Sequence, residues 1–101
     1  MNDSLLDVIH DTAKDIHKSG VMDTTTMREF DALCLPQVNH YAPGQIRSIR
    51  EKNKASQAVF AAYLNISVST IQKWERGDKK PNGPSLKLLN MVARKGLDVL
   101  A

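Results

Sequence analysis

The stretch Ser56–Gly77, which runs SQAVFAAYLNISVSTIQKWERG, decides the fold of this chain. Ser56 and Ser67 are residue types that favour helix N-caps, and each is followed by a segment with the apolar spacing of a helix. Between these segments, Asn65 stands where the chain must leave the first helix, and Asn tolerates the left-handed backbone conformation second only to Gly. The stretch therefore predicts two short helices joined by a tight turn.

The second of these helices has two distinct faces. On a helical wheel, Ile71 and Trp74 fall close together and are expected to face inward. Glu75, the only acid in this helix, falls beside the buried side and needs a cationic partner. The outward face carries hydrogen-bonding groups and two cations but no acid: Ser69, Gln72, Lys73 and Arg76. Without the surrounding motif, simple solvation would be the favoured explanation of this charged face. The motif reverses that preference and makes the face a candidate recognition surface.

Length and composition limit what the rest of the chain can be. The 101 residues allow one compact domain with an appendage, and 42% apolar with 25% charged residues are ordinary globular values. A membrane span needs ~18 apolar residues in a row, which the chain lacks, and its N-terminus is acidic where a secretory signal would be basic. We therefore expect a soluble cytoplasmic protein. Its single cysteine, Cys34, excludes an internal disulfide and a multi-cysteine zinc site.

The charge is divided unevenly along the chain. Residues 1–43 carry 3 cations and 7 acids, a net charge of −4, whereas residues 44–101 carry 11 cations and 4 acids, a net charge of +7. The basic part is expected to meet phosphates, and the acidic part either meets something basic or is merely solvated. Because Pro43 fits a first helical turn, we place the boundary there, with an N-terminal segment 1–42 and a second domain 43–101.

Caps and apolar periodicity predict helices throughout and hardly any strand. One helix begins at the capping-box pattern of Thr26 and Glu29 and ends before Pro36. It is too short to be stable alone, so it needs another surface, from this chain or from a partner. The other expected helices cover about 5–18, 44–52, 57–64, 68–76 and 85–95.

The last helix has more apolar surface than one core contact requires. Lys87, Asn90 and Arg94 leave it only a narrow polar side. Its apolar residues spread over about 220° of the wheel: Leu86, Leu88, Leu89, Met91, Val92 and Ala93. The excess predicts a second buried contact, most simply a two-fold homodimer through Leu88 and Met91. Alternatively, these two residues cover the acidic N-terminal segment.

The central stretch resembles the phage-repressor-like (Xre) helix-turn-helix family. The shared pattern is Ser-Gln, a small residue in the first helix (here Ala61), a capped second helix and Trp-Glu-x-Gly, and it covers roughly residues 44–95. One departure is Asn65, where the family usually has Gly. The resemblance implies an all-α, lambda-repressor-like bundle with an acidic helical N-terminal extension. It also implies a structural ion pair between Arg50 and Glu75.

The resemblance further implies how the chain would meet double-stranded DNA. Phosphate-contacting positions, which set register without reading sequence, are Ser56, Gln57, Arg76, Lys79 and Lys80. Positions that face base edges in the major groove are Val68, Ser69, Gln72 and Lys73. A homodimer would place two such helices in successive grooves of a palindromic operator.

The chain as a whole resembles HigA-like antitoxins of type II toxin–antitoxin systems. The similarity lies in the acidic helical segment, the run I-R-S-I-R-E-K at 46–52 and the run K-K-P-N-G-P-S-L-K-L-L at 79–89. It implies a bacterial cytoplasmic repressor that neutralises a small basic RelE/HigB-like ribonuclease toxin and autoregulates its operon. Acids such as Asp7, Asp11 and Asp15 would oppose the toxin's cations, and apolar residues would contact it: Leu5, Ile9, Ile16, Met27, Phe30 and Leu33.

Three alternatives remain open. The first is a stand-alone Xre-type regulator whose N-terminal helices only complete the core or the dimer. The second is an enzyme or metal sensor built from His10, His17, His40 and Cys34, but no further ligand lies at a suitable spacing. The third is an RNA-binding or coactivator use of the same fold. We expect no catalytic activity, no cofactor, no metal and no membrane association.

Overall fold

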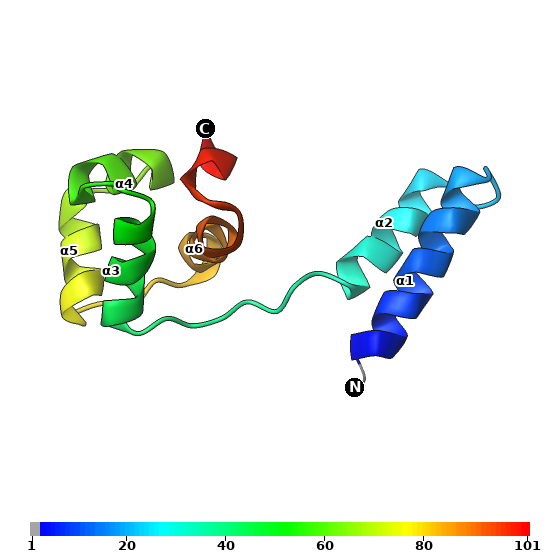
Figure 1. The fold of residues 1–101 in the computed structure, drawn as a ribbon, viewed down its shortest axis with the longest axis horizontal. Coiled ribbons are helices and arrows are strands. Elements are labelled where there is room, and N and C mark those ends of the chain that lie inside the picture. Colours follow the sequence, from blue (N-terminus) through cyan, green and yellow to red (C-terminus); the bar gives the residue numbers. More distant parts are fainter. Residues whose placement is uncertain (1–2) are drawn as a thin grey trace. The chain divides into compact units, whose positions relative to one another are not determined.

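A computed structural model describes residues 3–101 of the chain, and its side chains from Leu5 onward. All regular structure in this part is helical, which confirms the expected all-α class (Figure 1). None of the described helices is long and apolar enough to cross a membrane. The elements are α1 (Asp3–Lys18), α2 (Thr24–Leu33), α3 (Pro43–Lys52), α4 (Gln57–Leu64), α5 (Val68–Arg76), α6 (Gly83–Lys95) and the 3₁₀ helix η1 (Leu97–Leu100).

The chain forms two compact units, which we call unit 1 (residues 1–37) and unit 2 (residues 38–101). The division falls five residues before the boundary expected at Pro43, because the segment 38–42 is held by α6. Asn90 of that helix accepts a hydrogen bond from the Asn39 N–H (2.8 Å) and donates one to the Asn39 carbonyl (2.9 Å).

Asn90 itself corrects the helical-wheel prediction. The wheel assigned Asn90 to a solvated polar side, but the residue is only 3% exposed. Its amide also donates to the Leu86 carbonyl at 2.8 Å, and the Tyr41 hydroxyl donates to its oxygen at 3.4 Å. A buried amide needs such partners, and here the segment before α3 supplies most of them. Asn90 is therefore an internal anchor for this segment.

Unit 1 is a pair of helices, α1 and α2, that lie side by side (Figure 1). Asp23 caps α2 by accepting a hydrogen bond from the Thr26 N–H at 2.7 Å. The helix therefore begins at Thr24, and the capping box predicted at Thr26 is wrong. Ala13 and Met27 are buried between the helices, and His10 Nε2 lies 2.7 Å from Asp31 Oδ1 across them.

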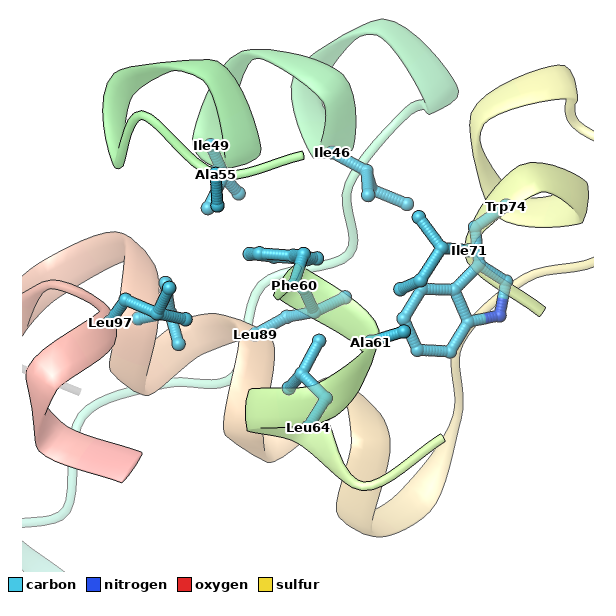
Figure 2. Close-up of a cluster of buried hydrophobic side chains, with 11 residues drawn as sticks. Ile46, Ile49, Ala55, Phe60, Ala61, Leu64, Ile71, Trp74, Leu89 and Leu97 are labelled. Atoms are coloured by element: carbon cyan, nitrogen blue, oxygen red, sulfur yellow. The ribbon is translucent and has the colours of Figure 1, made fainter. Parts of the chain in front are cut away.

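Unit 2 holds a single hydrophobic core built by α3 to α6 and η1 (Figure 2). Phe60, Ile71 and Leu89 are completely buried at its centre. The surrounding core residues are Ile46, Ile49, Ala55, Ala61, Leu64, Trp74, Val92 and Leu97. The four helices of this unit lie where the sequence predicts them, within two residues at each end. The element η1 was not predicted, and it is attached by the Leu97 N–H, which donates to Asn53 Oδ1 at 3.0 Å.

Candidate nucleic-acid interface

The turn between α4 and α5 is built as the sequence predicts. Ser56 Oγ accepts a hydrogen bond from the Val59 N–H at 3.2 Å, and Ser67 Oγ accepts one from the Thr70 N–H at 3.1 Å, so both serines are N-caps. Asn65 ends α4 in the left-handed conformation, with φ 56° and ψ 46°. The two caps and this residue fix the direction in which α5 leaves the turn.

Helix α5 has one buried and one outward side. Ile71 and Trp74 anchor it in the core of unit 2, as expected (Figure 2). Val68 at its first position is 37% exposed, which leaves a methyl-bearing side chain accessible at the helix N-terminus. The outward face, which we call the α5 face, consists of exposed Ser69, Gln72 and Arg76 with half-buried Lys73.

The ion pair implied by the resemblance is present and fixes α5 against α3. Arg50 Nε donates to Glu75 Oε2 at 2.8 Å, and Arg50 Nη2 donates to Glu75 Oε1 at 2.9 Å. Arg50 Nη1 also donates to the Ala55 carbonyl at 3.1 Å. The two side chains are only 13% and 7% exposed, so water can replace little of this pairing. Two parallel hydrogen bonds also fix the orientation of both groups.

The ion pair shifts the pKa values of both Arg50 and Glu75. Burial by itself would raise the pKa of the Glu75 carboxyl, but the hydrogen bonds and charge of Arg50 outweigh that effect, and this pKa lies below its ordinary value. The pKa of Arg50 is raised, chiefly because the guanidinium donates hydrogen bonds to Glu75. Both groups are therefore charged at neutral pH. Glu75 is thus removed from the α5 face, which contains no acid.

The structure gives Gln57 a role that the sequence did not indicate. Its Nε2 lies 3.4 Å from Glu75 Oε1, so the amide contacts the ion pair, and its assignment to a DNA phosphate stays a prediction. Gln57 and Gln72 line a cavity of about 380 Å³ together with Arg47 and Arg76. Arg47 was missed as a candidate because its position in α3, before the Ser56–Gly77 stretch, gave no signal beyond a solvated charge.

The other cations assigned to phosphates are exposed. Lys79 and Lys80 follow the end of α5 and are solvent-accessible. Arg76 is exposed as well, although its Nε donates to Asp78 Oδ2 at 3.0 Å. That exposed pair is weak, and a phosphate can compete with Asp78 for the guanidinium.

The residues assigned to dimer contacts are partly accessible. Leu88 packs against the core of unit 2 and remains half-buried, as does Met91. Both side chains keep some area that another surface could cover.

Unit 1 carries an apolar stripe along its two helices, but Met27 is not part of it. Met27 is only 6% exposed and lies in the contact between α1 and α2, so its assignment as a direct toxin contact is wrong. Val8, which was not among the predicted contacts, is 61% exposed and belongs to the stripe. The stripe consists of exposed Leu5, Val8, Ile9, Ile16 and Leu33 with half-buried Phe30.

The histidines and the cysteine lie in separate surroundings. His10 pairs with Asp31, His17 Nε2 lies 3.4 Å from Thr24 Oγ1, and Cys34 donates a weak hydrogen bond to the Leu6 carbonyl. Among the side chains of residues 5–101, no three of His, Cys, Asp or Glu come together in a way that could hold a metal ion.

Residues 46–100 match the helix-turn-helix family, so the chain belongs to this family of DNA-binding motifs. The chain is also similar to the antitoxin HigA-2 of Vibrio cholerae serotype O1 (strain ATCC 39315 / El Tor Inaba N16961), with 43% identity over 53 residues. This match covers 52% of the present chain and 51% of HigA-2. The chain therefore spans about half the length of this curated relative.

Proposed function

We propose that this protein is an autoregulating antitoxin. In this proposal unit 2 binds a palindromic operator as a homodimer, and unit 1 neutralises a small basic ribonuclease toxin of the RelE/HigB-like type. The observation that carries the proposal is the α5 face, where polar and cationic side chains stand together without an acid while Ile71 and Trp74 anchor the helix from behind. The similarity to HigA-2 supports the antitoxin part.

The α5 face suits the major groove of DNA. Lys73 can donate to guanine O6 and N7, Gln72 can pair with adenine, and Val68 can pack on a thymine methyl group. Lys79 and Lys80 carry positive charge but no arrangement of hydrogen-bonding groups that matches one base, which suits contacts with phosphates. Two copies joined through Leu88 and Met91 would present two α5 faces to half-sites about 34 Å apart.

Replacing a base-reading residue and replacing a phosphate-contacting residue should have different effects on DNA binding. We expect Gln72→Ala or Lys73→Ala to cost about 1–3 kcal/mol on the operator and much less on random DNA, because these side chains read bases. Lys79→Ala or Lys80→Ala should weaken binding to every sequence and reduce the slope of affinity against salt by about one unit each. Fluorescence anisotropy on both kinds of DNA at several salt concentrations measures these effects.

Lys95→Ala provides the matched control for this experiment. Lys95 is an exposed cation that the assignment leaves out of the interface. Its removal should change neither operator affinity nor the salt slope by as much as the Lys79 or Lys80 variants. If all these variants lose the same affinity on operator and random DNA, the division into base-reading and phosphate-contacting residues is wrong.

The apolar stripe of unit 1 supports the toxin-binding part of the proposal. Exposed apolar side chains in a row are costly in water, and a partner surface would bury them. The acids Asp7, Asp11 and Asp15 lie on the same helix, and their charge suits a basic partner. A toxin that uses cations to hold RNA would thus meet both an apolar and an acidic surface.

Copurification with the product of the neighbouring gene tests this part. We expect Ile9→Asp or Ile16→Asp to abolish binding of a small basic protein, because each places a charge within the stripe. Val21→Asp is the matched control, since Val21 is 80% exposed in the turn between α1 and α2 and lies outside the stripe. Equal loss in all three variants, or no basic protein bound to the unaltered chain, would exclude the antitoxin function.

A second candidate function is a stand-alone transcriptional regulator. It is favoured by the extent of the match to HigA-2, which covers only half of each chain. In this case the stripe of unit 1 would serve contacts between two copies of this chain. Deleting residues 1–37 would then lower the oligomeric state, and no toxic activity would be released in cells.

A further inference from the structure

We propose that unit 2 also contains a binding site for a small organic anion with an apolar body. The site is a cavity of about 500 Å³ beside the N-terminus of α3, the end of α5 and the segment that leads into α6. Its volume lies within the range of about 300–1,000 Å³ that is usual for small-molecule sites. Its walls include Ile46, Trp74, Pro81 and Leu86, all of which are buried residues of the domain.

The indole of Trp74 gives the cavity an unused hydrogen-bond donor. Trp74 is only 3% exposed, yet its Nε1–H donates no hydrogen bond within the part of the chain that the structure describes. In the same part of the chain, every fully buried side-chain nitrogen or oxygen atom has a hydrogen-bond partner. The N–H must therefore face open space, and the cavity that Trp74 lines provides it. Figure 2 shows this nitrogen on the edge of the indole that is turned away from Phe60.

An acceptor in the cavity would give the Trp74 N–H a hydrogen-bond partner that the described part of the chain does not supply. A carboxylate or phosphate oxygen on the ligand would accept this hydrogen bond. The bond would be charge-assisted and therefore stronger than one between neutral groups.

The charges around the cavity favour an anion. Lys79 and Lys80 line it, and none of its lining residues is an acid. The N-terminus of α3 also meets it through Ala42 and Pro43, and Ala42 offers no side-chain acceptor to the first turn of that helix. The positive end of the helix dipole therefore adds to the charge of the lysines.

The apolar walls distinguish a small organic anion from a DNA phosphate. A nucleic-acid phosphate could use Lys79, Lys80 and the helix end, but it would leave Ile46 and Leu86 uncovered. A short aliphatic or aromatic acid would fill the cavity with its body and hold its charge at the lysines. If the proposed function is correct, such a ligand would neutralise two phosphate-contacting cations and weaken operator binding.

Titration of the full-length, ¹⁵N-labelled protein with octanoate tests this inference. The chain has one tryptophan, so the Trp74 indole N–H gives a single resonance that reports the site directly. We expect a saturable shift of this resonance with one octanoate per chain. Octanol has the apolar body without the charge, and inorganic phosphate has the charge without the apolar body. Each should therefore bind at least about fivefold more weakly than octanoate.

A pair of charge variants provides the control. Lys79→Gln/Lys80→Gln should weaken octanoate binding about fivefold, since it removes both cations from the cavity. Lys52→Gln/Lys95→Gln removes the same charge from exposed positions outside this cavity and should leave octanoate binding unchanged. Both double variants alter surface residues and should retain the wild-type circular dichroism spectrum.

Several results would overturn the proposal. The proposed site is excluded if the indole resonance does not respond to octanoate. It is also excluded if the resonance responds equally to octanol or to phosphate. A response to operator DNA but not to octanoate assigns the cavity to the DNA interface instead. If octanoate binds at Trp74 without changing operator affinity, the site stands and its regulation of DNA binding fails.

Discussion

Arg50 and Glu75 hold α5 in place through two hydrogen bonds of 2.8 and 2.9 Å, and neither side chain is more than 13% exposed. Taking away one partner would leave the other charge buried. We expect Arg50→Met to lower the free energy of unfolding by about 3–5 kcal/mol, because the Glu75 carboxylate would keep only the 3.4 Å contact of Gln57. Urea denaturation followed by circular dichroism measures this loss.

Arg47→Met is the control for this prediction. Arg47 makes a comparable hydrogen bond, with its Nε 2.9 Å from Glu51 Oε1, but the two side chains are 66% and 56% exposed. Exposed pairs contribute at most about 1 kcal/mol, so this variant should be nearly as stable as the wild type. Similar losses in the two variants would mean that burial does not set the strength of the Arg50–Glu75 pair.

The same pair makes stability depend on pH. The pKa of Glu75 in the folded chain lies below its ordinary value of 4.5, since Arg50 outweighs the effect of burial. Its contribution is therefore complete above about pH 4.5 and is lost as the pH falls through the folded value. We expect the stability difference between wild type and Glu75→Gln to shrink between pH 7 and pH 3, measured by urea denaturation.

The difference in stability between wild type and Glu75→Gln reports the titration of Glu75 alone and not that of other carboxylates. The pKa of Asp23 is lowered by a hydrogen bond from the Thr26 N–H, and that of Asp31 is lowered by one from His10. Both groups are unchanged in Glu75→Gln, so their effect cancels. A stability difference that stays constant with pH would show that Glu75 titrates alike in the folded and unfolded chain.

At the level of the elements, the turn between α4 and α5 depends on one residue with a positive φ. Asn65 adopts φ 56°, which Gly accepts without strain and Ala does not. We expect Asn65→Gly to leave the thermal midpoint nearly unchanged and Asn65→Ala to cost about 1–2 kcal/mol. Thermal unfolding of both variants tests this, and equal midpoints would mean that the turn does not enforce the left-handed conformation.

The elements of unit 2 could be predicted from sequence because local signals agree with the fold. Ser56 and Ser67 mark helix starts, Asn65 and Gly77 mark helix ends, and the apolar spacing between them identifies the buried faces. The start of α2 was misplaced because two capping patterns overlap at residues 23–29. Asp23 prevailed over Thr26, since its carboxylate is charged and accepts the N–H three residues on.

Residues whose role depends on a distant partner were not predictable. The wheel places Asn90 among polar neighbours, and only its contacts with Asn39 and Tyr41, about fifty residues earlier, explain its burial. Met27 shares the apolar face of α2, but periodicity does not tell whether α1 or a partner covers it. The α5 face was predictable because the whole of it lies within one helix.

At the scale of the whole molecule, the charge division and the two units separate two kinds of surface. Unit 2 holds the single continuous core and the cationic α5 face, while unit 1 has only the contact between two helices and an exposed apolar stripe. Two helices bury little surface, so their stability as a unit is small and a partner that covers the stripe would add to it. If the proposed function is correct, we therefore expect substitutions in one unit to abolish partner binding or DNA binding without abolishing the other.

The boundary between the units can be tested by two truncations that differ by five residues. The fragment 38–101 keeps the full core and the segment that satisfies Asn90, so it should unfold cooperatively like a small domain. The fragment 43–101 loses Asn39 and Tyr41 and leaves the Asn90 amide with only the Leu86 carbonyl as partner. We expect it to be less stable by about 1–3 kcal/mol, as a buried polar group would lack its hydrogen bonds.

The variant Asn90→Leu tests whether the lost hydrogen bonds of Asn90, rather than the shortening of the chain itself, destabilise the fragment 43–101. In the fragment 43–101, Asn90→Leu removes the unsatisfied amide and should recover part of the lost stability in urea denaturation. In the fragment 38–101, the same change strands the backbone groups of Asn39 and should be destabilising. If Asn90→Leu has the same effect in both fragments, the segment 38–42 contributes nothing through Asn90, and the boundary belongs at Pro43.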